Sequence, residues 1–422
     1  MTPTHAQAAR PLQAPPPGSR RAEIALVAGE EFTRRGYHST RVEHIADRLE
    51  VTPGALYRHV PGKYEMFRDA VAILISELES ATGGAPVTGG DRTDVDEEDA
   101  LRHVVESVTL TTLTHRSRAS LYRWQLRYLS PEDRAAVVAA DARVRGRVAD
   151  AVRGRRRGGP TAGAGSAAGA ILSCIASLGH HRIEITGPDA VTLMTSIADD
   201  LALCIPQRRR QPDTAARTGP PGAAPGSIRL RGGAATREGA ISAAIELFHS
   251  TGYDGVTMEA IGADVGVAAS ALYRHFPGKA ALLTAAVDRT AGLVGDLLDR
   301  HAAWHGAGTD PAGSLVDLLD QYIGIAFSHG PELMLYHSEL GSLATEDRRR
   351  IQRAQRAQLD RWANLVNEAS RAHGGTPPDE VTARLRVHAA LSVVLDGGWG
   401  TGFDPAATAR LGELARTLLL PR

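Results

Sequence analysis

Two short segments of this chain carry side chains that can hydrogen-bond to phosphate oxygens and to base edges. Residues 55–63 read Ala-Leu-Tyr-Arg-His-Val-Pro-Gly-Lys, and residues 271–279 read Ala-Leu-Tyr-Arg-His-Phe-Pro-Gly-Lys. A phenol, a guanidinium, an imidazole and an ammonium group can each donate to a phosphate oxygen. The two copies lie 216 residues apart and carry the same four donor side chains, so the second is equipped to bind whatever the first binds.

The residues around the first copy predict the helices that must position it. Apolar spacing and breakers predict helices over about 20–35, 42–49 and 53–59, and a further helix opening at Lys63. Thr40-Arg41-Val42-Glu43 reads as a capping box, and Thr52 before Pro53 reads as an N-cap before a favoured first helical residue. Two short helices joined by a tight turn form a helix-turn-helix, whose second helix can enter the major groove of DNA.

The predicted DNA-facing residues combine small side chains with polar ones. Small residues at the start of the second helix allow close approach to base edges and thymine methyl groups, and a lysine at a helix N-terminus is well placed for a phosphate. In the first copy they are Thr40, Arg41, Thr52, Pro53, Gly54, Ala55, Tyr57, Arg58, His59 and Lys63. In the second copy they are Thr257, Ala268, Ala269, Ser270, Tyr273, Arg274, His275 and Lys279.

The duplication covers the whole half-chain. Residues 21–63 align without gaps on 237–279, and a later echo, Leu121-Tyr122 with Leu335-Tyr336, recurs at an offset of 214. Proline, glycine and arginine dominate 207–233, which predicts a flexible linker. The predicted divisions are a disordered tail 1–19, head 1 over 20–66, body 1 over 67–206, the linker, head 2 over 234–282 and body 2 over 283–422.

Composition excludes several classes of protein. The 48 basic and 48 acidic residues balance, so an argument for nucleic-acid binding must be local. The two cysteines, Cys174 and Cys204, fit a reducing cytoplasm and exclude a disulfide framework. No apolar run spans a membrane, and no catalytic motif, cofactor fingerprint or metal site is recognised; His301 and His305 have helical spacing but no third ligand nearby.

Each copy resembles the N-terminal head of the TetR family of bacterial regulators. The first does so through Gly36-Tyr37, Thr40, Ile45-Ala46, Val51-Thr52, Gly54-Ala55-Leu56-Tyr57, His59 and Lys63. The second does so through Gly252-Tyr253, Thr257-Met258-Glu259, Ile261, Gly266-Val267, Ala271-Leu272-Tyr273, His275-Phe276 and Lys279 to Leu283. The resemblance implies a helical ligand-binding and dimerising body after each head, and repression of transcription controlled by a ligand.

Each head departs from the family pattern. Head 1 has Glu50 where the turn usually has glycine, which predicts a strained left-handed residue costing about 1 kcal/mol. Head 2 has Ala268 where the N-cap is usually Ser or Thr, a loss of about 1 kcal/mol. Because Ala269-Ser270 stands opposite Pro53-Gly54, the two heads are predicted to read different half-sites of one asymmetric operator.

The bodies read as helices, so the fold class is all-α. The predicted helices lie near 64–80, 98–115, 117–129, 131–153, 165–183 and 188–205 in half 1, and near 280–302, 312–328, 331–343, 345–373, 379–396 and 405–420 in half 2. The last helix of each half is amphipathic, and the two halves are candidates to pair as a four-helix bundle. Residues predicted to line a pocket for a hydrophobic effector are Trp124, Tyr128, Cys174, Tyr322, Met334, Tyr336 and Trp399, although an ordinary core explains each of them as well.

Two interpretations remain open at this point. The first is a sequence-specific regulator with two working heads, acting as an intramolecular pseudo-dimer or as a homodimer. The second is a helical small-molecule-binding or scaffold protein in which only one head binds DNA. Nothing in the sequence supports an enzyme or a bound cofactor.

Overall fold

The computed structural model describes residues 12–83, 94–118, 121, 126–156, 161–179, 181, 183–204, 233–304 and 310–420. Every regular element in these ranges is helical, which confirms the predicted all-α class. In half 1 they are α1 (Arg20–Arg35), α2 (Val42–Arg48), α3 (Pro53–Tyr57), α4 (Lys63–Gly83), α5 (Asp94–Thr114), η1 (Leu126–Tyr128), α7 (Pro131–Arg155), α8 (Ala164–Ser177) and α9 (Gly187–Leu203). In half 2 they are α10 (Gly233–Thr251), α11 (Met258–Val265), α12 (Ala269–Tyr273), α13 (Lys279–Trp304), α14 (Pro311–Ser328), α15 (Gly330–Ser338), η2 (Leu340–Ser342), α16 (Thr345–Ala372), α17 (Glu380–Gly400), η3 (Pro405–Ala407) and α18 (Thr408–Leu419).

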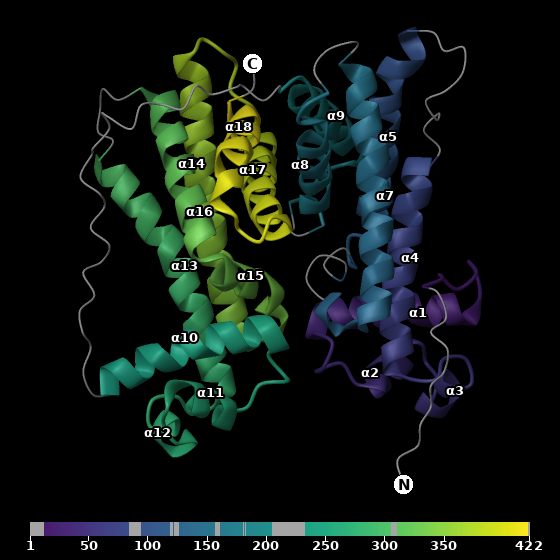
Figure 1. Ribbon diagram of the computed structural model, residues 1–422, viewed down its shortest axis with the longest axis vertical. Helices are drawn as coiled ribbons and strands as arrows, with labels where there is room; N and C mark the ends of the chain where they lie inside the picture. Colours follow the sequence, from purple (N-terminus) through teal and green to yellow (C-terminus); the bar gives the residue numbers. More distant parts are fainter. Residues whose placement is uncertain are drawn as a thin grey trace.

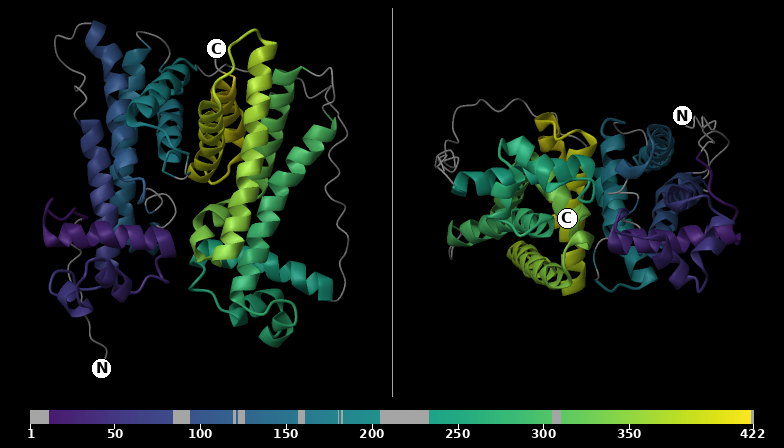
Figure 2. Two further views of the ribbon diagram at one scale, coloured as in Figure 1. Left: turned by 180° about the vertical axis from the view of Figure 1, so that it is seen from behind. Right: turned by 90° about the horizontal axis from the view of Figure 1, so that it is seen from below.

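The two halves stand side by side with the same internal plan (Figure 1). In each half, three long helices run roughly parallel: α4, α5 and α7 in half 1, and α13, α14 and α16 in half 2. The first helix of each half, α1 or α10, lies across one end of these long helices, and the two short helices of the head are beneath it. Both heads therefore occupy the same end of the molecule, as Figure 2 also shows from behind.

Local sequence signals explain where the helices begin and end. Ser19 caps α1 by accepting from the Ala22 amide at 3.2 Å, and Ser130 before Pro131 caps α7 by accepting from the Asp133 amide at 3.1 Å. Gly36 and Gly252 end α1 and α10 at φ values of +84° and +85°, which glycine adopts without steric cost. The predicted bounds of α1 and the start of α4 at Lys63 are both confirmed.

One apolar core crosses from half 1 to half 2 at the end of the molecule away from the heads. Helices α8 and α9 of half 1 pack against α17 and α18 of half 2, with α17 against α8 and α18 against α9 (Figure 1). The amphipathic faces of the two last helices are buried there, through Leu193, Ile197, Leu201, Leu411, Leu414 and Leu418. The predicted pairing of the last helices is therefore present within one chain.

Arginine side chains from both halves gather at the C-terminal end of α9. Arg410 of half 2 donates to the Cys204 carbonyl at 2.9 Å, and Arg156 of half 1 donates to the Ala202 carbonyl at 2.6 Å. Two cations at one helix C-terminus satisfy its free carbonyl groups and complement the helix dipole. Elsewhere in the contact between the halves, the imidazoles of His181 and His388 lie 4.6 Å apart, and burial lowers the pKa of His388 to about 4.

Two predictions about irregular segments need correction. Residues 12–19 are not a free tail, because Leu12 packs against the core of head 1 and Pro15 is buried. Over 117–129 the described helical residues are Leu121 and the single 3₁₀ turn η1. Residues 1–11 and nearly all of the predicted linker 207–233 lie outside the described residues, and the division into domains remains a prediction.

Candidate nucleic-acid interface

The second helix of each helix-turn-helix presents one buried anchor and a row of exposed polar groups. Leu56 of α3 and Leu272 of α12 are buried in the cores of their heads. The next residues, Tyr57 and Tyr273, are 50% and 51% exposed, which is unusual for tyrosines of an ordinary core. Arg58, His59 and Arg274 are also exposed, and His275 is partly exposed.

The start of each recognition helix is open, as predicted. Thr52 and Gly54 are exposed in head 1, and a Cβ added at Gly54 would meet no atom within 4 Å. Ala268 and Ser270 occupy the equivalent open positions in head 2. Pro53, Ala55 and Ala269 are partly exposed beside them. Both heads thus carry an uncovered helix end with small side chains, which is what close approach to base edges requires.

The two lysines are engaged differently from the prediction. Lys63 donates to the His38 carbonyl at 3.0 Å and lies 4.7 Å from the centre of the Tyr37 ring. Lys279 repeats this arrangement, donating to the Tyr253 carbonyl at 2.8 Å and lying 4.4 Å from that residue's ring centre. Burial lowers the pKa of both ammonium groups. In this structure each lysine holds the turn after the first helix, and its contact with phosphate remains a prediction.

Thr40 does not face DNA, so that prediction is wrong. It is fully buried, and its hydroxyl donates to the Gly36 carbonyl at 2.7 Å. Arg41 is the N-cap residue of α2 instead, with an exposed side chain. In head 2 the equivalent N-cap is Thr257, which accepts from the Ala260 amide at 3.2 Å. The error arises because the capping motif in head 1 is shifted by one residue relative to Thr40.

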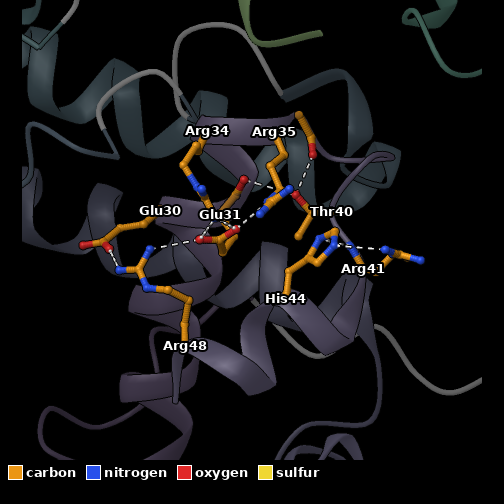
Figure 3. Close-up of polar contacts among 9 residues, drawn as sticks. Glu30, Glu31, Arg34, Arg35, Thr40, Arg41, His44 and Arg48 are labelled. Atoms are coloured by element: carbon orange, nitrogen blue, oxygen red, sulfur yellow. Dashed lines mark hydrogen bonds and ion pairs between the residues drawn. The ribbon is translucent and has the colours of Figure 1, made fainter. Parts of the chain in front are cut away.

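Head 1 contains an ionic cluster that the search for DNA-binding motifs missed. The carboxylate of Glu31 is fully buried and accepts hydrogen bonds from Arg34, Arg35 and Arg48 at 2.6 to 2.9 Å (Figure 3). Burial alone would raise the pKa of Glu31, but the hydrogen bonds and charges of the three guanidinium groups outweigh it and leave the pKa lowered. The spacing of Glu31 from Arg34 and Arg35, three and four residues, is the signal that would have revealed it.

At the turn between the two short helices, the left-handed conformation predicted for Glu50 is confirmed, whereas the predicted difference in N-capping is small. Glu50 has φ +54°, so head 1 does hold a non-glycine residue in the left-handed region, whereas Gly266 has φ +76° in head 2. Thr52 and Ala268 are both N-cap residues, but the Thr52 hydroxyl makes no capping hydrogen bond. The two recognition helices therefore differ less in capping than the sequence suggests.

The residues predicted to line an effector pocket do not come together. Cys174 lies in the apolar core that joins the halves, and Tyr322 lies in the same core with its ring edge on Trp362. Tyr336 belongs to the core of head 2, and Met334 is buried in the same helix, α15. Trp399 is 51% exposed. Tyr128 stacks on Tyr37 of head 1, and Trp124 lies outside the described residues.

The described part of the chain has neither a metal-ligating cluster nor a membrane span. No group of three or more metal-ligating side chains is present there. No helix of that part is long and apolar enough to cross a bilayer.

Comparison with known proteins identifies both heads. The family model of bacterial regulatory proteins of the tetR family matches residues 24–70 and again residues 240–286. The two heads are therefore TetR-family helix-turn-helix domains, and the chain is a tandem TetR-like protein.

Individual relatives match parts of the chain. The HTH-type transcriptional activator FasR of Mycolicibacterium smegmatis is 34% identical over 92 residues, which cover 22% of this chain and 40% of FasR. Among solved structures, PfmR of Thermus thermophilus is 22% identical with a TM-score of 0.37, covering 45% of this chain and 99% of PfmR. FadR of Bacillus halodurans, a fatty acid degradation regulator, is 20% identical with a TM-score of 0.37, covering 44% of this chain and 94% of FadR.

Proposed function

We propose that this chain is a ligand-responsive transcriptional repressor whose two fused heads bind one asymmetric DNA operator. The observation that carries the proposal is that two exposed recognition helices, α3 and α12, lie at one end of a single chain whose halves share a core at the other end (Figure 1). Fusion raises the effective concentration of one head relative to the other, so both can bind DNA without a second chain.

The mechanism of the proposed regulation is a change in head separation. Two heads that read successive major grooves on one face of DNA must lie about 34 Å apart or a multiple of it. An effector that shifts the long helices of a body would move its head and prevent simultaneous binding. Ligand control and repression rest on the resemblance to the family, and the effector is proposed to be a hydrophobic small molecule.

The solution mass, measured by light scattering, tests the pseudo-dimer. The DNA would be the segment upstream of the chain's own gene, and the free chain has a mass of 44.7 kDa. We expect one chain free and one chain per DNA duplex in the complex. Two chains per duplex would show that the bodies pair between molecules. A reporter gene under the same DNA should be less active when the chain is present, and higher expression would make the chain an activator.

One observation favours a second candidate, in which head 1 alone supplies most of the affinity for DNA. Head 2 has only three arginine or lysine residues over 234–282, namely Arg237, Arg274 and Lys279, and Lys279 is bound to its own turn. Arg237 lies over the Phe276 ring at 5.3 Å. Phosphate contacts dominate affinity for DNA, so a head with few free cations binds weakly.

A further inference from the structure

Each head contacts the opposite half of the chain through one of a pair of equivalent turns. The 3₁₀ turns η1 and η2 correspond at the offset of 214, and each lies against the first helix of the opposite head. Turn η2 packs against α1, where a Cβ added at Gly341 would lie 3.4 Å from the Arg34 carbonyl. Turn η1 reaches α10, where Arg127 donates to the His249 carbonyl at 3.3 Å. We call this pseudo-symmetric pair of contacts, η1 with α10 and η2 with α1, the cross-over junction.

The cross-over junction is asymmetric in the size of its side chains. Tyr128 of η1 lies so close to Gly252 that a Cβ added there would be 2.6 Å from the tyrosine hydroxyl. At the equivalent place, a Cβ on Gly36 would be 3.6 Å from the Ser342 hydroxyl, an ordinary contact. The position of Tyr128 is also fixed within half 1, because its ring stacks on Tyr37 with centroids 4.9 Å apart.

Polar contacts reinforce the same junction. Arg127 of half 1 forms an ion pair with Glu339 of half 2, whose side chain is only 5% exposed. Ser39 in the turn after α1 donates to Asp254 in the turn after α10 at 3.1 Å. A buried ion pair and a direct turn-to-turn hydrogen bond both require one defined placement of the heads.

We propose that the cross-over junction sets the distance between the two recognition helices, and that Tyr128 and Gly252 determine which half-site spacing the chain accepts. This rests on the proposed function. Without the junction, each head would be held by its own half alone, through α4 and the residues around η1 in half 1 and through α13 and α15 in half 2. A 10° swing of a helix about 30 Å long moves its end by about 5 Å, which exceeds the rise of one base pair, about 3.4 Å. Direct contact between the heads resists that swing.

The chain offers a matched pair of variants for the test. Gly252→Ala and Gly36→Ala place the same methyl group at equivalent positions with φ of +85° and +84°, so both carry the same kind of backbone strain. Only Gly252→Ala drives a methyl group into Tyr128. Tyr128→Ala removes the side chain that contacts Gly252 without adding backbone strain, and it serves as a second variant. Ser342→Ala is its equivalent in η2.

The first measurement uses no DNA. Spin labels at the exposed, equivalent positions Asp47→Cys and Ala263→Cys, in a chain with Cys204→Ser and with Cys174 buried, report the distance between heads. We expect one narrow distribution for the parent, Gly36→Ala and Ser342→Ala, and a shifted or broadened one for Gly252→Ala and Tyr128→Ala. Equal distributions for all five proteins would overturn the role of the junction.

The second measurement tests operator spacing. From a random-sequence duplex library selected by the parent chain, the preferred duplex is altered by one or two base pairs between its half-sites. We expect the parent and Gly36→Ala to lose at least about tenfold in affinity per inserted base pair, and Tyr128→Ala to lose less than about threefold. Equal tolerance in parent and Tyr128→Ala would refute the spacing role. If no duplex is selected, the proposed function fails while the distance measurement still judges the junction.

Discussion

The two heads share one helical plan but stabilise it by different chemistry. Head 1 and the helix α4 that follows it bury two carboxylates: Glu31 is bound by three arginines, and Asp69 is bound by Arg21. At the equivalent positions, head 2 has Leu247 and Ala285 and fills the space with apolar contacts. A duplicated fold therefore tolerates replacement of buried ion pairs by apolar contacts, provided that each buried charge and its partners change together.

The two heads also differ in the number of exposed arginines that could contact DNA phosphates. Head 1 carries Arg34, Arg35, Arg41, Arg48 and Arg58, all at least partly exposed, although three of them are shared with Glu31. Head 2 has Ser250, Thr251, Thr257 and Asp264 opposite the first four and retains only the last, as Arg274. The arginines that pair with Glu31 thus also give head 1 a more basic surface. We expect a change in the buried ion pairs to change the affinity of head 1 for DNA as well.

The largest expected effect comes from removing one equivalent arginine in each head. Arg21 forms two hydrogen bonds with the buried Asp69, at 2.5 and 3.0 Å, whereas the equivalent Arg237 lies over the Phe276 ring. Arg21→Ala should lower the free energy of unfolding by about 3–5 kcal/mol because it leaves a buried carboxylate without its partner. Arg237→Ala should cost only about 0.5–1 kcal/mol, the value of an exposed cation–π contact.

Denaturant unfolding measures both variants, and a second substitution tests the reason. Adding Asp69→Ala to Arg21→Ala copies the alanine of head 2 and should recover most of the loss. Equal losses for Arg21→Ala and Arg237→Ala would show that the two heads do not differ in how they are stabilised.

The next effect concerns affinity for DNA. Tyr57→Ala with Arg58→Ala, and Tyr273→Ala with Arg274→Ala, remove equivalent exposed pairs. We expect a loss on the order of 100-fold for head 1 and less than about 10-fold for head 2, since a contact worth about 1.4 kcal/mol is tenfold in affinity. Titration of the selected operator by fluorescence anisotropy at fixed salt measures both. Equal losses would show that both heads contribute alike, and would remove the case for a dominant head 1.

Acid should act on head 1 before head 2. The pKa of Glu31 is lowered in the folded state, so its contribution to stability is complete above the unfolded value of about 4.5 and is lost as the pH falls through the folded pKa. Each unit of lowering is worth about 1.4 kcal/mol. Head 2 has Leu247 at this position and lacks that contribution.

Hydrogen exchange read peptide by peptide at pH 7 and at pH 3 resolves the heads separately. Amides of α1 and α2 should lose more protection in acid than those of α10 and α11. The variant Glu31→Leu is the control, because it should make the two heads respond alike. Earlier acid opening of α10 would contradict the assignment of acid sensitivity to Glu31.

The comparison also shows what local sequence can predict. Helix bounds in the heads were predictable within two residues, because Gly36, Pro53 and Lys63 act on the backbone close to where they stand. The exposed Tyr57 and Tyr273 were predictable from the helical period once the buried leucine beside each was assigned. Both inferences depend on residues within one or two turns of each other.

The parts that sequence did not predict depend on contacts between segments that are far apart in the sequence. Tyr128 reads as a pocket residue, yet its place is decided by Tyr37 and by Gly252, which is 124 residues away. Lys63 reads as a free cation, yet a carbonyl 25 residues earlier in the chain accepts its hydrogen bond. No local pattern encodes such partners, because they arise only when folding brings the turn after α1 against the start of α4 and against the turn η1.

The smallest expected effect, and the one that isolates a single backbone angle, is an exchange in the turn between the two short helices. Glu50 and Gly266 are equivalent residues with φ of +54° and +76°, both in the left-handed region. Glu50→Gly should stabilise head 1 by about 0.5 kcal/mol, because relief of the left-handed strain exceeds the added entropy of the unfolded chain, and Gly266→Ala should destabilise head 2 by a similar amount. Because both side-chain positions are exposed, neither change alters the packing of a core. Thermal unfolding of the two single variants and of the double variant should therefore show opposite shifts that nearly cancel in the double, provided that the heads unfold together. Two shifts of the same sign would mean that the carboxylate of Glu50 stabilises head 1 by an interaction larger than the strain of its backbone.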